Sequence, residues 1–369
     1  GYPAKTNLLR VDLGLLFPVL ILAGIGVVMV YSASSHIAAQ RFGDGAYFLK
    51  RQAVFLAAGI GLMVCCRYVS YRVFRFTAYG LLGLAIVLLG LLYVKGIGYT
   101  AGGATRWMHV GPVSFQPSVF ATFALIIYLA YSLNKKKDKI TDFSIGFVPH
   151  VVVFAVLSLL IVMQPDFGTV MILAALTALM LFVAGVRVVH LLASGIFLVP
   201  VAAFYMFAAD YRRQRLISFL DPWQYKSDEG YQVVHSLMAF GTGGLWGTGI
   251  GQGYQKLFYL PEPHTDFIFS VIGEELGLWG VLVILALYFV ILWRGILIAR
   301  NADDLFGSFV AVGLTVAIGL QVVINMGVAV GLLPAKGLTL PFLSYGGTSL
   351  LFNLAAVGIL MNIEQRRNG

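Results

Sequence analysis

Residues 254–277 read YQKLFYLPEPHTDFIFSVIGEELG, and this stretch places three ionisable side chains directly before a long apolar run. Its two prolines forbid a continuous helix, because proline lacks a backbone N–H and restricts the residue before it. Glu262, His264 and Asp266 are thus presented at a membrane edge, where a charged group is typically kept for chemistry, ion handling or pairing. The alternative is that Thr265 or Asp266 only caps the following helix.

The composition identifies an integral membrane protein. Apolar residues make up 59% of the 369 residues, charged residues 11%, and the mean hydropathy is +0.88, whereas soluble domains carry about 25% charged residues. The net charge of +9 indicates basic loops at anionic lipid headgroups, and we expect no nucleic-acid partner. The adjacent Cys65 and Cys66 lack the spacing of metal ligands and are interpreted as packing thiols.

Apolar segments of roughly 18 or more residues predict an all-α polytopic fold with about ten transmembrane helices. We expect a single transmembrane domain over residues 1–369, with a large ordered extracytoplasmic loop, about 209–267, between helices 7 and 8. Within this loop, residues 231–240 are expected to form a short amphipathic helix in the interface. The predicted helices run near 13–32, 48–66, 76–94, 117–133, 149–163, 168–185, 188–208, 268–293, 307–331 and 343–361.

The orientation follows from the distribution of Lys and Arg between alternate loops, since cytoplasmic loops carry the excess. One set of loops holds about fourteen of these residues and the short loops on the other side hold about six, so both termini are predicted to be cytoplasmic. This orientation places the residues around Arg106, the turn at Asp166 and the long loop outside.

Basic residues of the long loop are candidates for contact with a lipid diphosphate. Guanidinium groups suit bidentate contact with phosphate oxygens, and lysine supplies a point charge. The alternative is a headgroup anchor for ordinary phospholipid, and the same holds for Arg106 beside Trp107. Asp166 is a possible ligand for a divalent cation, since hard cations prefer carboxylate oxygens. The candidate diphosphate contacts are Arg212, Arg213, Arg215 and Lys256.

The helix after Asp266 is expected to carry small residues below the acid. Ser270, Gly273 and Gly277 share a face with it on the 3.6-residue period. A lipid tail or another helix can therefore approach there. Glu274 and Glu275 lie deeper and are each expected to face the bundle interior and pair with a cation or polar group.

At these residues the sequence resembles the SEDS family (shape, elongation, division and sporulation), and the resemblance covers nearly the whole chain. The segment at residues 333–341 is more similar to the FtsW and SpoVE branch than to the RodA branch. The motifs that carry the resemblance are residues 30–34, 106–107, 115–118, 164–169, 211–215, 241–245, 261–269 and 344–347.

The resemblance implies a peptidoglycan glycosyltransferase that polymerises lipid II at the outer face of the bacterial cytoplasmic membrane and releases undecaprenyl diphosphate. It implies that Asp266 is the catalytic general base for the acceptor sugar hydroxyl, in an inverting single displacement. Arg106, Glu262 and His264 are then candidates for substrate contact. The resemblance also implies a divalent cation, Mg or Mn, no organic cofactor, a class B penicillin-binding protein as partner, and other divisome or elongasome proteins.

One departure from the family pattern keeps two other functions open. After residues 115–118 the family usually shows Glu-Leu-Ala-Lys, and this chain has Val119 and Thr122 in place of the acid and the base. Loss of both together is what an intramembrane ion pair permits, because loss of one strands a buried charge. The alternatives are a flippase that moves lipid II outward and a polymerase-inactive scaffold for the transpeptidase.

Overall fold

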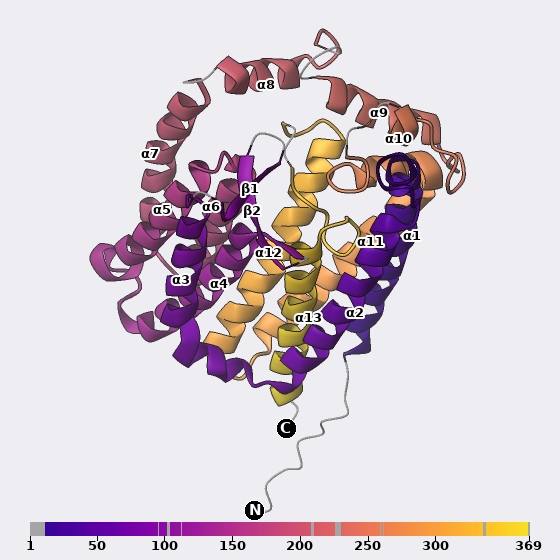
Figure 1. Cartoon of the computed structure of the whole chain (residues 1–369). Coiled ribbons are helices and arrows are strands. Elements are labelled where there is room, and N and C mark those ends of the chain that lie inside the picture. The colour runs from indigo at the N-terminus through magenta and orange to yellow at the C-terminus, as the bar shows by residue number, and fades with distance from the viewer. Residues whose placement is uncertain are drawn as a thin grey trace, which may run out of the picture.

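The computed structural model describes residues 12–94, 96–101, 104–111, 113–207, 210–225, 230–258, 260, 262–334 and 337–367. Within them the chain forms a bundle of long helices, and both of its ends lie at the same end of the bundle (Figure 1). The helices are α1 (Leu13–Phe42), α2 (Tyr47–Tyr68), α3 (Phe74–Leu91), α4 (Pro117–Lys135), α5 (Val148–Val162), α6 (Phe167–Val183), α7 (Val188–Phe207), α8 (Asp210–Leu220), α9 (Tyr231–Gly243), α10 (Gln255–Phe258), α11 (Ile268–Arg300), α12 (Leu305–Ala329) and α13 (Gly347–Arg367).

The helices confirm the predicted polytopic membrane fold. Among the described residues, eight helical segments are long and apolar enough to cross a membrane, and α6 and α7 contain shorter apolar stretches. Counting these two as spans gives the predicted total of about ten, and that total stays a prediction. Most predicted boundaries lie within a few residues of the observed ones, but α1 continues to Phe42 instead of ending near residue 32.

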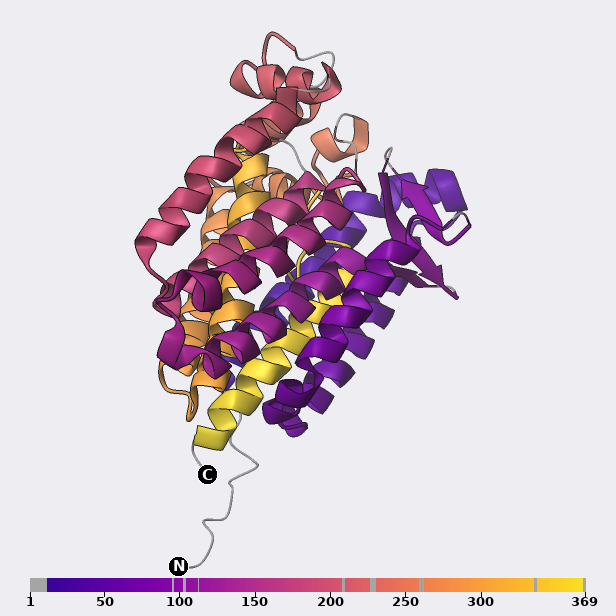
Figure 2. The ribbon, with the colours of Figure 1, turned by 90° about the vertical axis from the view of Figure 1, so that its left-hand side faces the viewer.

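The centre of the bundle is α12, which packs against α4, α6, α11 and α13. Small residues let the helices approach closely, as expected where van der Waals packing drives association in lipid. A Cβ on Gly295 of α11 would lie 2.2 Å from Oγ1 of Thr315, and one on Gly313 would lie 2.5 Å from Ile126 of α4. Figure 2 shows the same helices from the side, with α7 leaning away from the bundle toward α8.

The all-α prediction did not include a small antiparallel sheet, which lies between α3 and α4 in the chain. Its strands are β1 (Gly98–Ala101), β2 (Ala104–Val110) and β3 (Val113–Phe115). Gly98 pairs with Met108, which in turn pairs with Phe115. The sheet lies at the end of the bundle opposite the two chain ends (Figure 2).

The long connection between α7 and α11 contains three helices and is therefore ordered where it is described. The predicted amphipathic helix at residues 231–240 is confirmed as α9, which packs against α11 and α12. Its Ser236 hydroxyl contacts Oγ of Ser270 at 2.5 Å and donates to the carbonyl of Ala329. The α8 helix lies across the end of the molecule opposite the chain ends (Figure 1).

The connection between α7 and α11 packs against the bundle at a break in α11. Gly277 has φ 65° and ψ −165°, which is not helical. Residues 244–249 lie against the break and satisfy backbone groups that the interrupted helix leaves without partners, as buried peptide groups require. The hydrogen bonds run from Thr248 N–H to Glu274 O (2.9 Å), Gly249 N–H to Glu275 O (3.0 Å), Leu278 N–H to Gly244 O (3.0 Å) and Trp279 N–H to Leu245 O (3.4 Å).

We expect Gly277→Ala to destabilise the protein strongly. A Cβ there would lie 2.3 Å from the backbone nitrogen of Gly247, and the positive φ alone costs a residue with a side chain on the order of 1–3 kcal/mol. Thermal unfolding in detergent should show a clear fall in Tm. Gly83→Ala in α3 is the control, because nothing lies within 4 Å of its Cβ position. Equal Tm values for the two variants would contradict the close approach.

Candidate active site

Asp266 lies in the turn that precedes α11, and its side chain is half-buried. The alternative that it caps this helix is not supported. The N-cap residue of α11 is Phe267, and no side chain makes a cap hydrogen bond there. The hydroxyl of Thr265 donates instead to the carbonyl of Glu262 at 3.1 Å. The carboxylate of Asp266 is therefore available for a role other than capping.

The backbone of this turn is held by two distant parts of the chain. Asn325 of α12 donates from Nδ2 to the carbonyl of Asp266 at 3.0 Å. The Ser344 hydroxyl donates to the carbonyl of Thr265 at 2.6 Å, and the Tyr345 N–H donates to that of His264 at 2.9 Å. The position of Asp266 thus depends on bonds to its main chain, while its carboxylate projects toward Gly337, whose Cβ position lies 3.1 Å from Oδ2.

Burial raises the pKa of Asp266 from 3.8 to about 7. The charge of Glu262 raises the pKa further, while the charge of Arg106 and a hydrogen bond from Thr265 oppose the shift. A carboxyl group with this pKa is half ionised near neutral pH, which is the range that suits a general base.

Arg106 extends from the small sheet toward the Asp266 turn. Its side chain leaves β2, donates from Nη2 to the carbonyl of Pro165, and places Nη1 3.8 Å from the Cβ position of Gly337. Asp266 and Arg106 therefore face the same point. Nε of Arg106 is buried and has no hydrogen-bond partner among the residues that the structure describes. One acid and one cation thus lie near the Cβ position of Gly337, and their catalytic and substrate-binding roles stay predictions.

Glu262 and His264 flank Asp266 but differ in exposure. Glu262 is 55% exposed and has a φ of 50°, so it is held in the left-handed region. His264 is buried between the rings of Phe48 and Tyr345, with ring centroids 4.4 and 5.6 Å away. Burial, and secondarily Arg41, lowers the pKa of His264 to about 4, so the ring is neutral at pH 7. Glu262 remains a candidate for substrate contact, whereas His264 packs the turn against α2.

Lys256 does not fit the predicted role in diphosphate binding. Its ammonium is buried, contacts the carboxylate of Glu275 and donates to the hydroxyl of Ser32 at 2.8 Å. An ammonium that already pairs inside the protein cannot reach a substrate at the surface. Sequence reasoning took the lysine for a loop cation, although Glu275 was expected to pair with a cation.

The three arginines of α8 are not brought to Asp266 by the described contacts. Arg213 is exposed, and the side chains of Arg212 and Arg215 lie outside the described residues. The helix that carries them packs against α7 and lies across the end of the molecule opposite the chain ends (Figure 1). Their contact with a diphosphate stays a prediction.

Asp166 caps α6, which uses both of its oxygens. Oδ1 accepts the N–H of Thr169 at 3.3 Å, and Oδ2 accepts its hydroxyl at 2.8 Å. Within the described parts of the chain, no group of three or more His, Cys, Asp or Glu side chains could hold a metal ion. These donors do not fit a resident metal site at Asp166, and the divalent cation stays a prediction.

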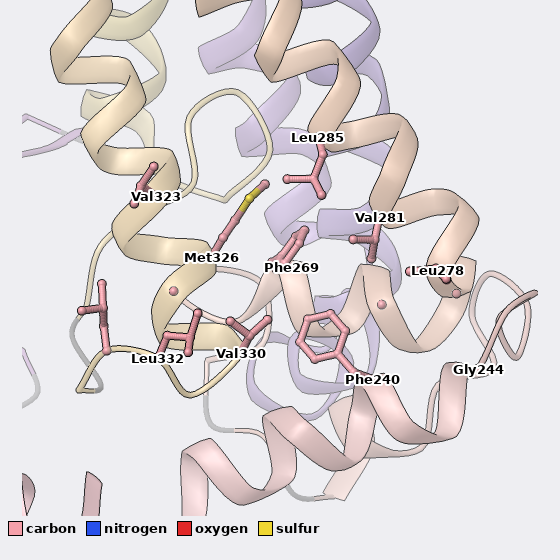
Figure 3. A pocket seen from close by; sticks show the side chains of 14 residues that line it. Phe240, Gly244, Phe269, Leu278, Val281, Leu285, Val323, Met326, Val330 and Leu332 are labelled. Carbon is pink, nitrogen blue, oxygen red and sulfur yellow. The ribbon is translucent and has the colours of Figure 1, made fainter. Parts of the chain in front are cut away.

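An apolar cavity of about 640 Å³ opens between α9, the outer part of α11 and α12 (Figure 3). It begins close to the turn, since Phe269 lies three residues after Asp266 and Met326 follows the Asn325 that holds it. The predicted small face contributes Gly273 and Gly277. Other lining residues are Phe240, Gly244, Leu278, Val281, Leu285, Val323, Gly327, Val330, Leu332 and Leu333.

The cavity suits an apolar chain. Val323 and Leu332 are largely exposed, as expected for a wall open to lipid. The glycines let a second element approach as well. A Cβ on Gly273 would lie 2.2 Å from the ring of Phe240. The predicted approach of another helix to the small face is thus confirmed, and the binding of a lipid tail in the cavity stays a prediction.

Comparison with known proteins gives a consistent result over the whole length. A family model described as cell cycle protein, FtsW/RodA/SpoVE, matches residues 13–369. The chain is 47% identical over 360 residues to a probable peptidoglycan glycosyltransferase FtsW of Geobacter sulfurreducens, covering 98% of this chain and 96% of the relative. It is 44% identical over 354 residues to stage V sporulation protein E of Bacillus subtilis, covering 96% and 97%.

A solved structure from work on polymerization and crosslinking by a peptidoglycan synthase complex shares the fold. Its TM-score is 0.81 at 30% identity, covering 97% of this chain and 99% of the other.

The positions where the family pattern expects Glu and Lys lie on α4. There Thr122 is buried and its hydroxyl donates to the carbonyl of Ser118 at 3.0 Å, so this position needs no ionic partner.

Proposed function

Because the chain belongs to the FtsW, RodA and SpoVE family of cell cycle proteins, we propose that it polymerises lipid II with Asp266 as the general base. The chain is a multi-pass membrane protein and a peptidoglycan glycosyltransferase of cell division. The identity of its substrate and the role of each side chain are the proposal. The observation that carries it is that the carboxylate of Asp266 and the guanidinium of Arg106 meet at Gly337, where burial raises the pKa of Asp266 to about 7.

In the proposed reaction Asp266 takes the proton of the acceptor's 4-hydroxyl group on N-acetylglucosamine. The oxygen then forms a bond to the anomeric carbon of the growing strand, while the bond from that carbon to the diphosphate breaks. Undecaprenyl diphosphate leaves with the electron pair, and a single displacement inverts the anomeric centre. Arg106 stabilises negative charge as it develops on the diphosphate.

The apolar cavity supports a substrate with a long hydrocarbon chain. It lies next to the Asp266 turn, and its walls are almost entirely aliphatic or aromatic. Part of the lining is exposed on the surface that lipid covers. A polyprenyl chain in this cavity would bring its diphosphate end toward Arg106 and Asp266.

The proposed setting is the outer face of the bacterial cytoplasmic membrane, with both termini in the cytoplasm. The excess of Lys and Arg in one set of loops supports this orientation. The proposed partner is a class B penicillin-binding protein, supported by the fold shared with a peptidoglycan synthase complex. A divalent cation would enter with the diphosphate, because the described residues form no resident site.

The polymerisation rate should rise with pH through a midpoint near 7. Only the ionised form of Asp266 accepts a proton, and burial raises its pKa to about 7. The rate is therefore low below pH 6, half-maximal near 7 and level above 8. Initial rates of glycan formation at saturating lipid II measure this profile. A rate that stays constant from pH 5 to 8 would exclude Asp266 as the base.

The direct experiment is a lipid II polymerisation assay on the purified protein, with and without a class B penicillin-binding protein. Glycan strands in the presence of the partner support the proposal. Headgroup translocation in vesicles without glycan product would favour the flippase. Partner binding without product, with activity gained when Glu and Lys replace Val119 and Thr122, would favour the scaffold.

A further inference from the structure

Asp266 lies on residues 256–275, a loop that includes part of α10 and the first two turns of α11, and a buried ion pair joins the two ends of this loop. Lys256 precedes it and Glu275 follows it at similar separations along the chain, and their side chains are 3% and 0% exposed. Ser32 of α1 completes the group, because its hydroxyl donates to Oε2 of Glu275 at 2.8 Å and accepts from Nζ of Lys256 at 2.8 Å. The pair therefore closes the loop at its base and attaches it to α1.

A second set of bonds fixes the same base. The carboxylate of Glu274 accepts the backbone N–H of Tyr254 at 2.8 Å and that of Gln255 at 3.2 Å. A Cβ on Gly253 would lie 2.7 Å from Oε2 of Glu274 and 3.3 Å from Cγ of Glu275. The incoming chain thus rests directly on α11, just before the break at Gly277.

We propose that Lys256, Glu275 and Ser32 form a positioning element that sets where the Asp266 turn stands relative to Arg106. The inference rests on the proposed role of Asp266 as the base. None of the three residues touches the substrate in this proposal. They act by fixing both ends of the loop that carries Asp266.

The chemistry of the element suits positioning better than stability. Removing two charges from water costs about as much free energy as their attraction gains. Replacing such a buried pair by well-packed apolar residues is therefore commonly neutral or stabilising. An ion pair with a third hydrogen-bonding partner fixes the relative orientation of the segments that carry it, because its bonds form in only one arrangement. A displacement of about 1 Å at a reacting group can cost about 100-fold in rate.

The test compares single and double variants in complex with a class B penicillin-binding protein, with lipid II as substrate. Lys256→Met and Glu275→Leu alone should each lower Tm, because each leaves a buried charge unpaired. The double variant should regain Tm, yet its kcat should stay about 100-fold below wild type with KM nearly unchanged. Lys256→Arg, which keeps the charge, should retain more activity than Lys256→Met.

The double variant should also show a pH midpoint below 7, because a turn that is less fixed admits water to Asp266 and relieves the burial that raises its pKa. A merely structural ion pair would not move this midpoint. A double variant with wild-type kcat, or one in which only KM changes, would overturn the proposal.

Arg294→Met is the matched control for loss of an ion pair at the other end of the bundle. Arg294 contacts Asp12 at 2.7 Å and Glu364 at 2.9 Å, and its loss should lower Tm without changing kcat. Asp266→Asn in the same assay separates the two proposals. If it is active, the proposed base is wrong. If it is inactive while the double variant works normally, only the positioning role is wrong.

Discussion

Asp266→Asn is expected to lower the rate of lipid II polymerisation by about 10²–10⁴-fold, the usual contribution of a positioned general base. The amide keeps the shape of the side chain but cannot accept the proton of the acceptor hydroxyl. The loss should fall on kcat, because the base acts in the transition state and contributes little to binding of lipid II. Steady-state rates of glycan formation in the presence of the partner measure it.

The same variant should fold at least as well as the wild type, which separates chemistry from stability. The pKa of Asp266 is raised in the folded protein from 3.8 to about 7. Its contribution to stability is therefore fully present below pH 4 and is lost as pH rises through 7. At pH 8 the wild type carries a partly buried charge that the Asn variant lacks, so Tm of the variant should be equal or higher.

Asp44→Asn is the control for removal of a carboxylate close to the same turn. Asp44 lies in the turn between α1 and α2, pairs with Lys50 at 2.7 Å, and has a side chain that is 42% exposed. A solvent-screened pair of this kind contributes little to stability, so this variant should keep both its Tm and its rate. If both Asn variants polymerised lipid II at the wild-type rate, Asp266 would not be the base.

The long helices could be predicted because hydrophobic length decides them. The apolar run at residues 307–331 is longer than a helix of a soluble protein needs. The structure places α12 at Leu305–Ala329. The end of α1 was missed because residues 33–42 are mixed in polarity, yet Ser34 and Ala38 are buried and the helix continues through them. Hydropathy locates the part of a helix that lies in lipid and says little about its extension beyond.

The site could be predicted only in part, because contacts between distant segments decide it. Asp266 and Arg106 were both singled out, but nothing in their spacing indicates that both face Gly337. Lys256 was assigned to the substrate since a lysine in a loop is usually solvated. The structure buries it against Glu275 of α11 and Ser32 of α1, and the 3.6-residue period of a helix does not indicate these contacts.

Arg106→Gln should lower kcat by about 10²–10³-fold, the effect expected when a donor to developing negative charge is removed from a partly enclosed site. The guanidinium donates to the carbonyl of Pro165 and faces the same point as Asp266. It therefore stands where a diphosphate leaving group would gain charge. The buried Nε, which has no partner among the described residues, is a donor that a phosphate oxygen would satisfy.

The pH profile distinguishes this role from a structural one. The charge of Arg106 opposes the rise in the pKa of Asp266, so its loss should move the midpoint of the rate above 7, toward higher pH. Arg106→Lys keeps the charge but not the planar geometry, and should restore the midpoint while recovering only part of kcat. Lys50→Gln, which removes an exposed cation of α2, should change neither quantity. An Arg106→Gln enzyme with an unchanged midpoint and a normal rate would show that this cation takes no part in the reaction.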